Sequence, residues 1–180
     1  MSIVKVGSMD EEHLREMMNS NHTSAFGWAL CCCHGDRDEA AEVLHTAYVQ
    51  VLEKGERSFS GNSSFKTWLF AVIRNTAKKR RFQIVRRARK LQSLAIGDRV
   101  EDGDAESGYY RSQIRGKILG LLQRISPRQR QILQLVFYHS LTLEEAAAVM
   151  NVSLGSARTH YERGKARLKA EMRKAGWDNE

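Results

Sequence analysis

The sequence predicts an all-α fold with two small helical domains that are joined by a flexible acidic linker. Long segments of the 180 residues carry apolar side chains at the three- and four-residue spacing of a helix, and none sustains the alternation of a strand. Pro127 is the only proline, so few positions interrupt a helix. The composition changes at Gly97 to Gly108, which hold five acidic residues and three glycines. We therefore expect domains at residues 1–95 and 112–180, with the linker at 96–111.

The first domain should begin with helices that are separated by a polar turn. One or two helices are expected from Glu11 to Cys33, ending near the sequence HGDRD. The next helix should run from about Asp38 to Lys54. Its apolar stripe is predicted at Ala41, Leu44, Tyr48, Val51 and Leu52.

A longer helix should follow the polar loop SFSGNSS and continue to roughly Leu94. Apolar residues in its first turns have the spacing i, i+3, i+4, i+7 and i+8, at Phe65, Trp68, Leu69, Val72 and Ile73. This spacing indicates that these side chains, including Trp68, form the apolar face with which the helix packs into the core.

The second domain should open with a helix from Gln113 to Arg124. Another helix should start at SPRQRQILQLVFYH, with Ser126 as N-cap and Pro127 at the first helical position. Thr142 and Glu145 then have the spacing of a capping box, which predicts a short third helix.

A tight turn and a final helix follow. The small residues Ala146 to Ala148 allow close helix approach, and NVS supplies a turn with Ser153 as the next N-cap. The final helix has its apolar residues at Leu154, Ala157, Tyr161, Leu168 and Met172. The opposite side presents Gly155 and the candidate DNA-reading residues Ser156, Arg158, Thr159, Glu162, Arg163 and Lys165. The pattern indicates a helix-turn-helix that enters a major groove, with a helical hairpin bearing a solvated basic face as the alternative.

The balance of charge predicts a polyanionic partner. Lys and Arg number 29 against 21 Asp and Glu, which gives a net charge of +8. Nine of these basic residues lie between Arg74 and Lys90, where there is no acid. No apolar run approaches a membrane span, and the first residues lack the apolar core of a signal peptide, so we expect a cytoplasmic protein.

The loop before the long helix suits an unpaired base better than a duplex. Phe59 offers a stacking ring, Gly61 permits close backbone approach, and Asn62 offers amide hydrogen bonds. With the start of the basic run, the candidate residues for a melted strand are Phe59, Gly61, Asn62, Ser63, Arg74, Asn75, Lys78 and Lys79.

Three consecutive cysteines, Cys31 to Cys33, precede His34. Adjacent residues on a helix point in different directions, so they do not converge on one metal as a spaced pair does. We interpret them as ordinary buried or half-buried thiols, with redox sensing or metal binding as the alternative. No metal, cofactor or catalytic residue is predicted, because an enzyme built on Cys33, His34 or His45 would lack a convergent acid–base set.

Two stretches, in this order and separated by an acidic linker, resemble a bacterial RNA polymerase sigma factor of the extracytoplasmic-function (ECF) group. RSFSGNSSFKTWLFAVIRNTAKK resembles the family's promoter-melting segment, and LTLEEAAAVMNVSLGSARTHYERGKARL resembles its helix-turn-helix for the minus-35 element. The likeness covers roughly Ala25 to Ala95 and Ser112 to Ala175. It implies a sigma region 2-like domain at 1–95, which melts the minus-10 element, and a region 4-like domain at 112–180. Asn75 matches the Asn of the family's ARN segment.

The resemblance also implies partners. These are promoter DNA and core RNA polymerase, through its clamp helices and its upstream-DNA flap, with an anti-sigma protein as a further candidate. The clamp contact falls on Glu42, His45, Tyr48 and Val49. Here AAEVLHTAY stands where the family usually has AEDLVQETF, so His45 and Thr46 replace a Gln-Glu pair. The acidic linker is expected to thread the polymerase cleft, with a solvated tether as the alternative.

We therefore expect a sigma factor that binds core polymerase and directs promoter recognition, DNA melting and transcription initiation, without enzymatic activity of its own. The alternative is a self-sufficient helix-turn-helix regulator whose N-terminal half dimerises or senses a ligand. Gly164 stands where the family favours alanine and should cost about 1 kcal/mol of helix propensity.

Overall fold

The structure, a computed structural model, describes residues 11–54, 59, 61–92, 120–122 and 124–177. All regular secondary structure in these ranges is helical, which confirms the all-α prediction. The chain divides into two compact units, Met1–Arg81 and Phe82–Glu180. This division falls within one continuous helix, whereas the sequence places a domain boundary near residue 95. The expected linker at 96–111 and most of the expected helix from Gln113 lie outside the described residues.

In the first unit, helices α1 (Glu11–Cys32) and α2 (Arg37–Lys54) pack against each other across a tight turn. His34 and Gly35 adopt positive φ values of 60° and 98° in that turn. The Asp36 carboxylate accepts a hydrogen bond from the Glu39 N–H at 2.9 Å, which starts α2. α1 is a single helix, where the sequence allowed one or two.

The buried face of α2 differs in part from the predicted stripe. Ala41 and Leu52 are exposed, so these two predictions are wrong. The apolar residues that α2 buries are Ala40, Val43, Leu44, Ala47 and Val51. Ala40 and Ala41 are adjacent, so the sequence pattern alone does not show which of them faces the core. Val43 is buried and lies three residues after Ala40, on the same side of the helix, so Ala40 is the buried alanine.

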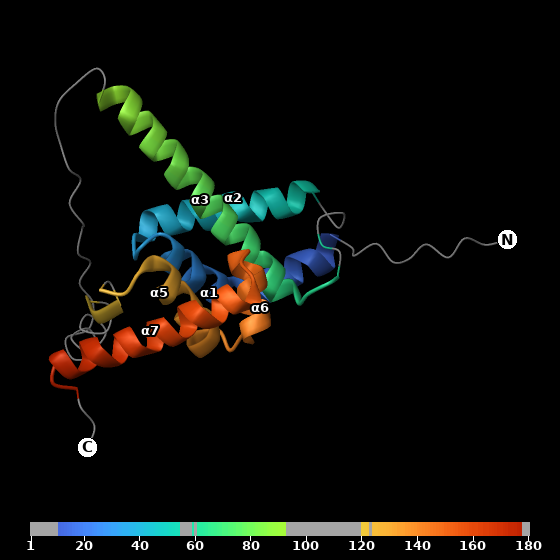
Figure 1. The fold of residues 1–180 in the computed structure, drawn as a ribbon. Coiled ribbons are helices and arrows are strands. Elements are labelled where there is room, and N and C mark those ends of the chain that lie inside the picture. The colour runs from blue at the N-terminus through green and yellow to red at the C-terminus, as the bar shows by residue number, and fades with distance from the viewer. Residues whose placement is uncertain (1–10, 55–58, 60, 93–119, 123, 178–180) are drawn as a thin grey trace, which may run out of the picture. The chain divides into compact units, whose positions relative to one another are not determined.

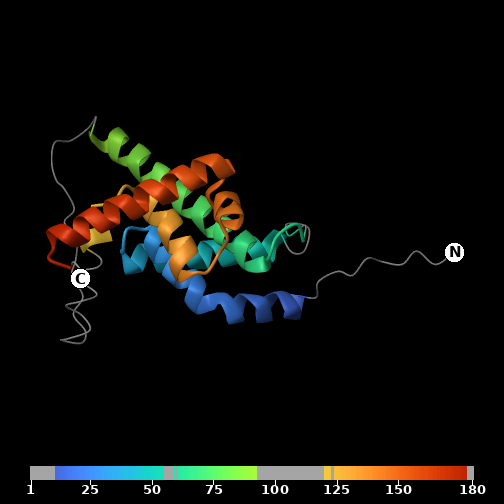
Figure 2. The same ribbon diagram turned by 60° about the horizontal axis from the view of Figure 1, so that its bottom comes forward.

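Helix α3 (Phe65–Gln92) begins where the Ser64 hydroxyl oxygen accepts a hydrogen bond from the Thr67 N–H at 3.1 Å. Of the predicted core stripe, Phe65, Leu69 and Ile73 are buried, while Trp68 and Val72 are half-buried. Figures 1 and 2 show α3 as one unbroken helix that is continuous through the division between the units.

Trp28 connects α1 to α3. Its indole N–H donates to the Phe70 carbonyl oxygen at 2.9 Å, and its ring stacks on the Phe70 ring with centroids 5.8 Å apart. Both side chains are fully buried. The first half of α3 is therefore held firmly in the core of the first unit.

The second unit contains the predicted helix-turn-helix, formed by α6 (Leu143–Met150) and α7 (Leu154–Lys174). The Thr142 hydroxyl oxygen accepts from the Glu145 N–H at 3.1 Å, and the Glu145 carboxylate accepts from the Thr142 N–H at 2.9 Å, which confirms the capping box. Asn151 ends α6 in the left-handed conformation, with φ 49°. Ser153 then caps α7 by accepting from the Ser156 N–H at 3.2 Å.

α5 (Pro127–Leu133) supports α7 and continues into the π-helical turn η2 (Gln134–Tyr138). Ser126 and Pro127 occupy the predicted N-cap and first helical positions, although the Ser126 side chain makes no capping hydrogen bond. α7 packs on both α5 and α6, and Figure 1 shows the three helices together.

α7 turns Ala157, Gly164 and Glu171 toward this support, at intervals of seven residues. Leu154 was predicted to pack inward but is 37% exposed, because it lies about 60° around the helix from Ala157. The structure explains why glycine is suited to position 164. A Cβ atom there would lie 3.2 Å from Leu133 Cδ1 and 3.3 Å from Gln129 Cβ. The glycine therefore allows close contact between α7 and α5.

Candidate nucleic-acid interface

The exposed side of α7 carries most of the predicted DNA-reading residues. Ser156, Arg158, Thr159, Glu162 and Arg163 are exposed. The Ser153 hydroxyl donates to the Ser156 hydroxyl oxygen at 2.9 Å, and the Thr159 hydroxyl donates to the Gly155 carbonyl oxygen at 2.9 Å. Because these two hydroxyl groups already have partners within the helix, the long side chains of Arg158 and Arg163 have the greater reach toward DNA.

Lys165 is oriented by its neighbours. Its ammonium group lies 3.0 Å from a Glu162 carboxylate oxygen and 4.4 Å from the centroid of the Tyr161 ring. The Tyr161 ring also stacks on Phe137 of η2, with centroids 5.8 Å apart. A substitution at Glu162 would thus change the position of a cation as well as remove an acceptor.

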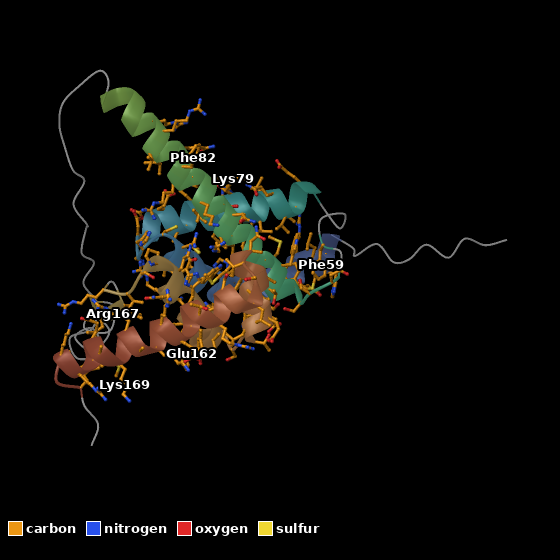
Figure 3. All side chains as sticks on the ribbon, in the orientation of Figure 1. Phe59, Lys79, Phe82, Glu162, Arg167 and Lys169 are labelled. Atoms are coloured by element: carbon orange, nitrogen blue, oxygen red, sulfur yellow. The ribbon has the colours of Figure 1, made fainter. Side chains whose placement is uncertain are left out.

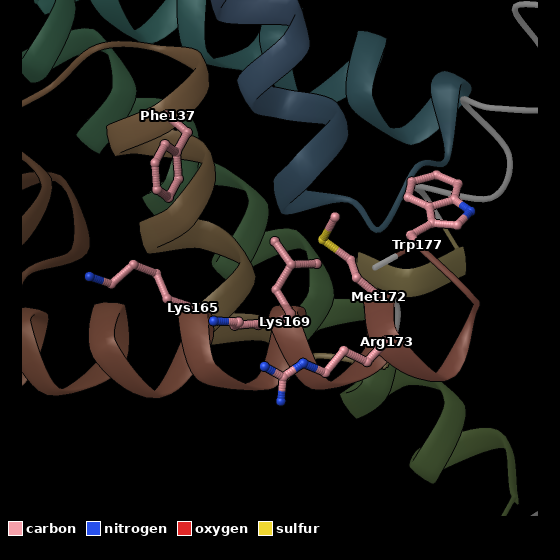
Figure 4. A pocket seen from close by; sticks show the side chains of 7 residues that line it. Phe137, Lys165, Lys169, Met172, Arg173 and Trp177 are labelled. Atoms are coloured by element: carbon pink, nitrogen blue, oxygen red, sulfur yellow. The ribbon is translucent and has the colours of Figure 1, made fainter. Parts of the chain in front are cut away.

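A groove of about 410 Å³ continues along α7 from Lys165. Its apolar lining is Phe137, Leu168, Met172 and Trp177, and its basic lining is Lys165, Lys169 and Arg173. Figure 4 shows the three cations rising from α7, with Phe137 on the facing element. This groove has an apolar lining beside positive charge, whereas the side of α7 that carries Arg158 is polar. α7 therefore presents two chemically distinct surfaces.

A buried carboxylate fixes the far end of α7. Glu171 is 2% exposed and lies 3.3 Å from each of Arg124, Arg167 and Lys174. Burial raises the pKa of its carboxyl group, but hydrogen bonds from Lys174 and Arg124 and the charges of Lys174 and Arg167 outweigh burial. The pKa therefore lies below its ordinary value.

The basic run of α3 is divided between the protein interior and solvent. Arg74 was predicted to contact DNA, but only 4% of it is exposed, so its guanidinium group cannot follow a phosphate backbone in this structure. The Arg80 guanidinium group pairs with Glu39 at 2.8 Å and lies 3.8 Å from Glu42. Arg81 contacts His34 Nε2 at 2.8 Å.

The remaining candidates on α3, Asn75, Lys78 and Lys79, are exposed. Figure 3 labels Lys79 on the part of α3 that follows the buried first turns. The prediction of a basic surface on this helix therefore applies to these side chains rather than to Arg74.

The loop before α3 is braced by aromatic rings. Phe59 is half-buried and lies 5.9 Å from Phe65 and 5.3 Å from Trp68, measured between ring centroids. Gly61 has a positive φ of 72°, and Asn62 and Ser63 are exposed next to it. The Phe59 ring thus holds the loop in place, and it offers less free surface for stacking than the sequence predicted.

The predicted polymerase-binding residues separate into two groups. Glu42, His45 and Val49 are exposed along one side of α2. Tyr48 is half-buried: its hydroxyl group lies 3.3 Å from His22 Nδ1 and 3.5 Å from the Met18 carbonyl oxygen, both on α1. Burial raises the pKa of Tyr48 to about 12. Tyr48 therefore contacts α1, and the exposed face is formed by the other three residues.

The cysteines have the environment of structural thiols. Burial raises the pKa of Cys32 well above its ordinary value, and burial with the nearby Glu39 and Asp36 charges raises that of Cys33 to about 12. Both thiols are therefore protonated at neutral pH, which lowers their reactivity. Within the described ranges, no three His, Cys, Asp or Glu side chains gather in a way that could hold a metal ion.

Exposed aromatic residues are the features that sequence reasoning missed. Phe82 on α3 is 68% exposed, and Phe137 and Tyr138 on η2 are 63% and 69% exposed. The seven-residue spacing from Asn75 to Phe82 could have identified the first of these. No helix in the part of the chain that the structure describes is long and apolar enough to cross a bilayer.

Comparison with known proteins is consistent with this geometry. The family model of sigma-70 region 4 matches residues 121–170, which include α5, η2, α6 and most of α7. The chain is similar to the RNA polymerase sigma-H factor of Pseudomonas aeruginosa, with 26% identity over 72% of this chain and 71% of that protein. The ECF RNA polymerase sigma factor SigE of Mycolicibacterium smegmatis is 25% identical over 78% of this chain and 54% of that protein. The ECF RNA polymerase sigma factor SigW of Bacillus subtilis is 24% identical over 78% of this chain and 76% of that protein.

Two solved structures share the fold. The sigma factor RpoE in complex with the anti-sigma factor NepR from Bartonella quintana has a TM-score of 0.68 and 21% identity, over 90% of this chain and 98% of that chain. CnrH in complex with the cytosolic domain of CnrY has a TM-score of 0.65 and 16% identity, over 92% of this chain and 90% of that chain. The region 4 match over residues 121–170 and the 24–26% identity over 72–78% of its length make this chain similar to RNA polymerase sigma factors, including members of the ECF group.

Proposed function

We propose that the protein is a transcription initiation subunit, which binds core RNA polymerase and directs it to promoters. In this proposal residues 1–95 bind the polymerase clamp helices and the melted minus-10 element, and residues 112–180 bind the polymerase flap and read the minus-35 element. Residues 96–111 connect the two. The protein acts in the cytoplasm and contributes no catalytic residue, because catalysis belongs to the core polymerase.

The observation that carries the proposal is the presence of two different basic surfaces on one chain. The helix-turn-helix presents Arg158 and Arg163 on α7, as duplex reading requires. α3 separately presents the exposed side chains of Asn75, Lys78 and Lys79, and the loop before α3 exposes Asn62. A repressor of the helix-turn-helix type needs the first surface alone, whereas a protein that also opens DNA needs both.

The exposed side of α2 supports a contact with polymerase. Glu42, His45 and Val49 combine an acid, an imidazole ring and an apolar side chain on a protein that is otherwise strongly basic. A surface of this kind is poorly suited to DNA and well suited to a protein partner. We assign it to the clamp helices of core polymerase.

Run-off transcription with purified core polymerase tests the function directly. The templates are genomic fragments, and each is transcribed with core alone and with core plus the protein. We expect defined transcripts only when both are present. The alternative, a self-sufficient regulator, predicts no new transcript and a palindromic footprint in the absence of polymerase.

An anti-sigma protein is a further proposed partner. The two solved structures that share the fold are both complexes, one with the anti-sigma factor NepR and one with the cytosolic domain of CnrY. Co-purification from the native cell, with and without competing core polymerase, would identify such a partner. Its capture should decline as core polymerase is added, since both would occupy the same subunit.

A further inference from the structure

Two stacked aromatic rings on η2 and α7 fix the position of one cation. The Phe137 and Tyr161 rings have centroids 5.8 Å apart and an angle of 28° between their planes. The Lys165 ammonium group lies 4.4 Å from the centroid of the Tyr161 ring, within the distance at which a cation is attracted to an aromatic face. Figure 4 shows Lys165 on α7 and Phe137 on the facing element. Lys165 is therefore held by a ring that a second ring holds in turn.

The same ammonium group contacts a carboxylate. Lys165 Nζ lies 3.0 Å from Glu162 Oε1, and the two side chains are 41% and 60% exposed. An ion pair this exposed contributes little to stability, because water screens it and ordering two long side chains costs entropy. Its effect is instead on position, since an ammonium group held by the ring restricts the conformations open to Glu162. The contact uses Oε1, so a donor from outside the protein can bind at Oε2.

Helix geometry puts this carboxylate on the side of α7 that is proposed to meet DNA. Arg158, Glu162 and Lys165 have the spacing i, i+4 and i+7, so their side chains lie within about 60° of one another around the helix. Figure 3 labels Glu162 on α7. An unpaired glutamate on this side would repel the phosphates of a duplex. Pairing with Lys165 neutralises that charge and keeps an acceptor on the reading side.

We propose that Tyr161 and Phe137 are positioning residues for base recognition. They hold Lys165 against Glu162, and Glu162 Oε2 accepts a hydrogen bond from the amino group of a cytosine in the upstream promoter element. Cytosine presents only a donor in the major groove, and a carboxylate presents only acceptors, so the two match. The other three bases each present an acceptor there, which a carboxylate does not bind. The inference rests on the proposed function, in which α7 reads duplex DNA.

The test measures the base preference of the holoenzyme, formed from core polymerase and the full chain. Each variant binds a library of promoter fragments with a randomised upstream element, and the measured quantity is the ratio of affinities for cytosine and for the other bases at each position. Glu162→Ala identifies the position that Glu162 reads. Tyr161→Leu removes the ring, whereas Tyr161→Phe keeps it. Lys165→Met removes the ammonium group, and Lys169→Met is its matched control, because Lys169 is exposed one turn further along α7.

We expect Glu162→Ala to reduce the preference for cytosine at one position by about 5- to 150-fold, the equivalent of one mismatched base pair. Tyr161→Leu and Lys165→Met should reduce the preference at the same position by about 2- to 5-fold, the equivalent of one exposed cation–π contact. Phe137→Leu, which removes the stacking partner of Tyr161, should act in the same direction. Tyr161→Phe and Lys169→Met should keep the preference of the unmodified protein.

Combined variants distinguish positioning from support of the fold. In a Glu162→Ala background, Tyr161→Leu should have no further effect on base preference, because the ring acts through Lys165 on that carboxylate. If Tyr161→Leu weakens binding to all sequences alike, the ring only supports the fold. If Tyr161→Phe loses as much preference as Tyr161→Leu, the hydroxyl group matters rather than the ring. Either result would overturn the proposal, as would an unchanged preference in Phe137→Leu or in Lys165→Met, which alters a half-buried side chain and leaves the rings in place.

The arginines of α7 separate this inference from the proposed function. If Arg158→Ala or Arg163→Ala alters binding to the upstream element and Glu162→Ala does not change the preference for cytosine, then α7 reads DNA and the assignment of Glu162 is wrong. Loss of a preference for another base in Glu162→Ala would have the same meaning. If none of the three variants has an effect, the wider proposal that α7 reads the upstream element is wrong as well.

Discussion

Arg80 of α3 and Glu39 of α2 form a two-point ion pair, with Nε 2.8 Å from Oε1 and Nη2 3.0 Å from Oε2. Their side chains are 32% and 25% exposed, so water screens the pair only in part. The pair joins the helix proposed to hold melted DNA to the helix proposed to bind polymerase. Its geometry is the kind for which a partly exposed ion pair contributes measurably to stability.

Glu39→Gln is expected to lower the free energy of unfolding by about 1 kcal/mol. The same substitution in an Arg80→Met background should cost much less, because its partner is already absent, and urea unfolding of the double-mutant cycle measures the difference. Glu42→Gln is the control: this carboxylate is 3.8 Å from Arg80 and 65% exposed, so its loss should cost less than about 0.5 kcal/mol. Equal effects at both positions would contradict the assignment.

Glu171 should make the second unit sensitive to acid. Its folded-state pKa lies below the ordinary value of 4.5, so the stability that it contributes is fully present above that value. This stability is lost as the pH falls through the lower, folded-state pKa. Thermal unfolding from pH 7 to pH 3 should show a steeper loss in the unmodified protein than in Glu171→Gln. Glu162→Gln, which removes an exposed carboxylate paired with Lys165, should leave the slope unchanged.

The two glycines at Gly155 and Gly164 of α7 should respond oppositely to alanine. Nothing lies within 4 Å of a Cβ atom at Gly155, so Gly155→Ala should stabilise the helix by up to about 1 kcal/mol. Gly164→Ala gains the same propensity but crowds Leu133 and Gln129, and overpacking costs about 1–3 kcal/mol. We expect no net gain, or a loss, at Gly164. Chemical denaturation of the two variants checks the order, and equal stabilisation would contradict the close contact between α7 and α5.

Arg158→Ala and Arg163→Ala should weaken binding to the upstream promoter element. Loss of a base contact costs about 1–3 kcal/mol and relaxes preference at one position, while loss of a phosphate contact weakens all sequences alike. Holoenzyme binding to a library of upstream elements distinguishes the two. Lys169→Ala, at the groove end of α7, serves as a control whose sequence preference should not change. The duplex-reading assignment fails if neither arginine affects affinity or selectivity.

Glu42→Lys should reduce affinity for core polymerase at least about tenfold, because it reverses the charge on a surface proposed to face a protein partner. A pull-down titration against core polymerase measures this, with circular dichroism to verify the helix content. Glu12→Lys reverses an exposed acid on α1 and is the matched control. Unchanged core affinity in Glu42→Lys would remove the assignment of this surface.

Local signals of the helix-turn-helix were readable from the sequence because they depend on neighbours in the chain. The Thr142–Glu145 capping box and the Ser153 cap are interactions across three residues, and both have the predicted form. The burial of Arg74 and the contact of Tyr48 with α1 depend on helices brought together from distant segments. Helical periodicity alone could not reveal these contacts, nor could it distinguish Ala40 from Ala41 on α2.

The burial of Arg74 and the pairing of Arg80 also alter the expected response of DNA binding to ionic strength. A cation displaces condensed counterions only if it reaches a phosphate, and each contact with single-stranded DNA steepens the logarithmic salt dependence by about 0.7. Among the side chains of this run that the structure describes, Arg74 is buried and Arg80 is paired with Glu39, so neither is available to a phosphate. The salt dependence contributed by α3 should therefore be shallower by about 1.4 than the sequence count implies.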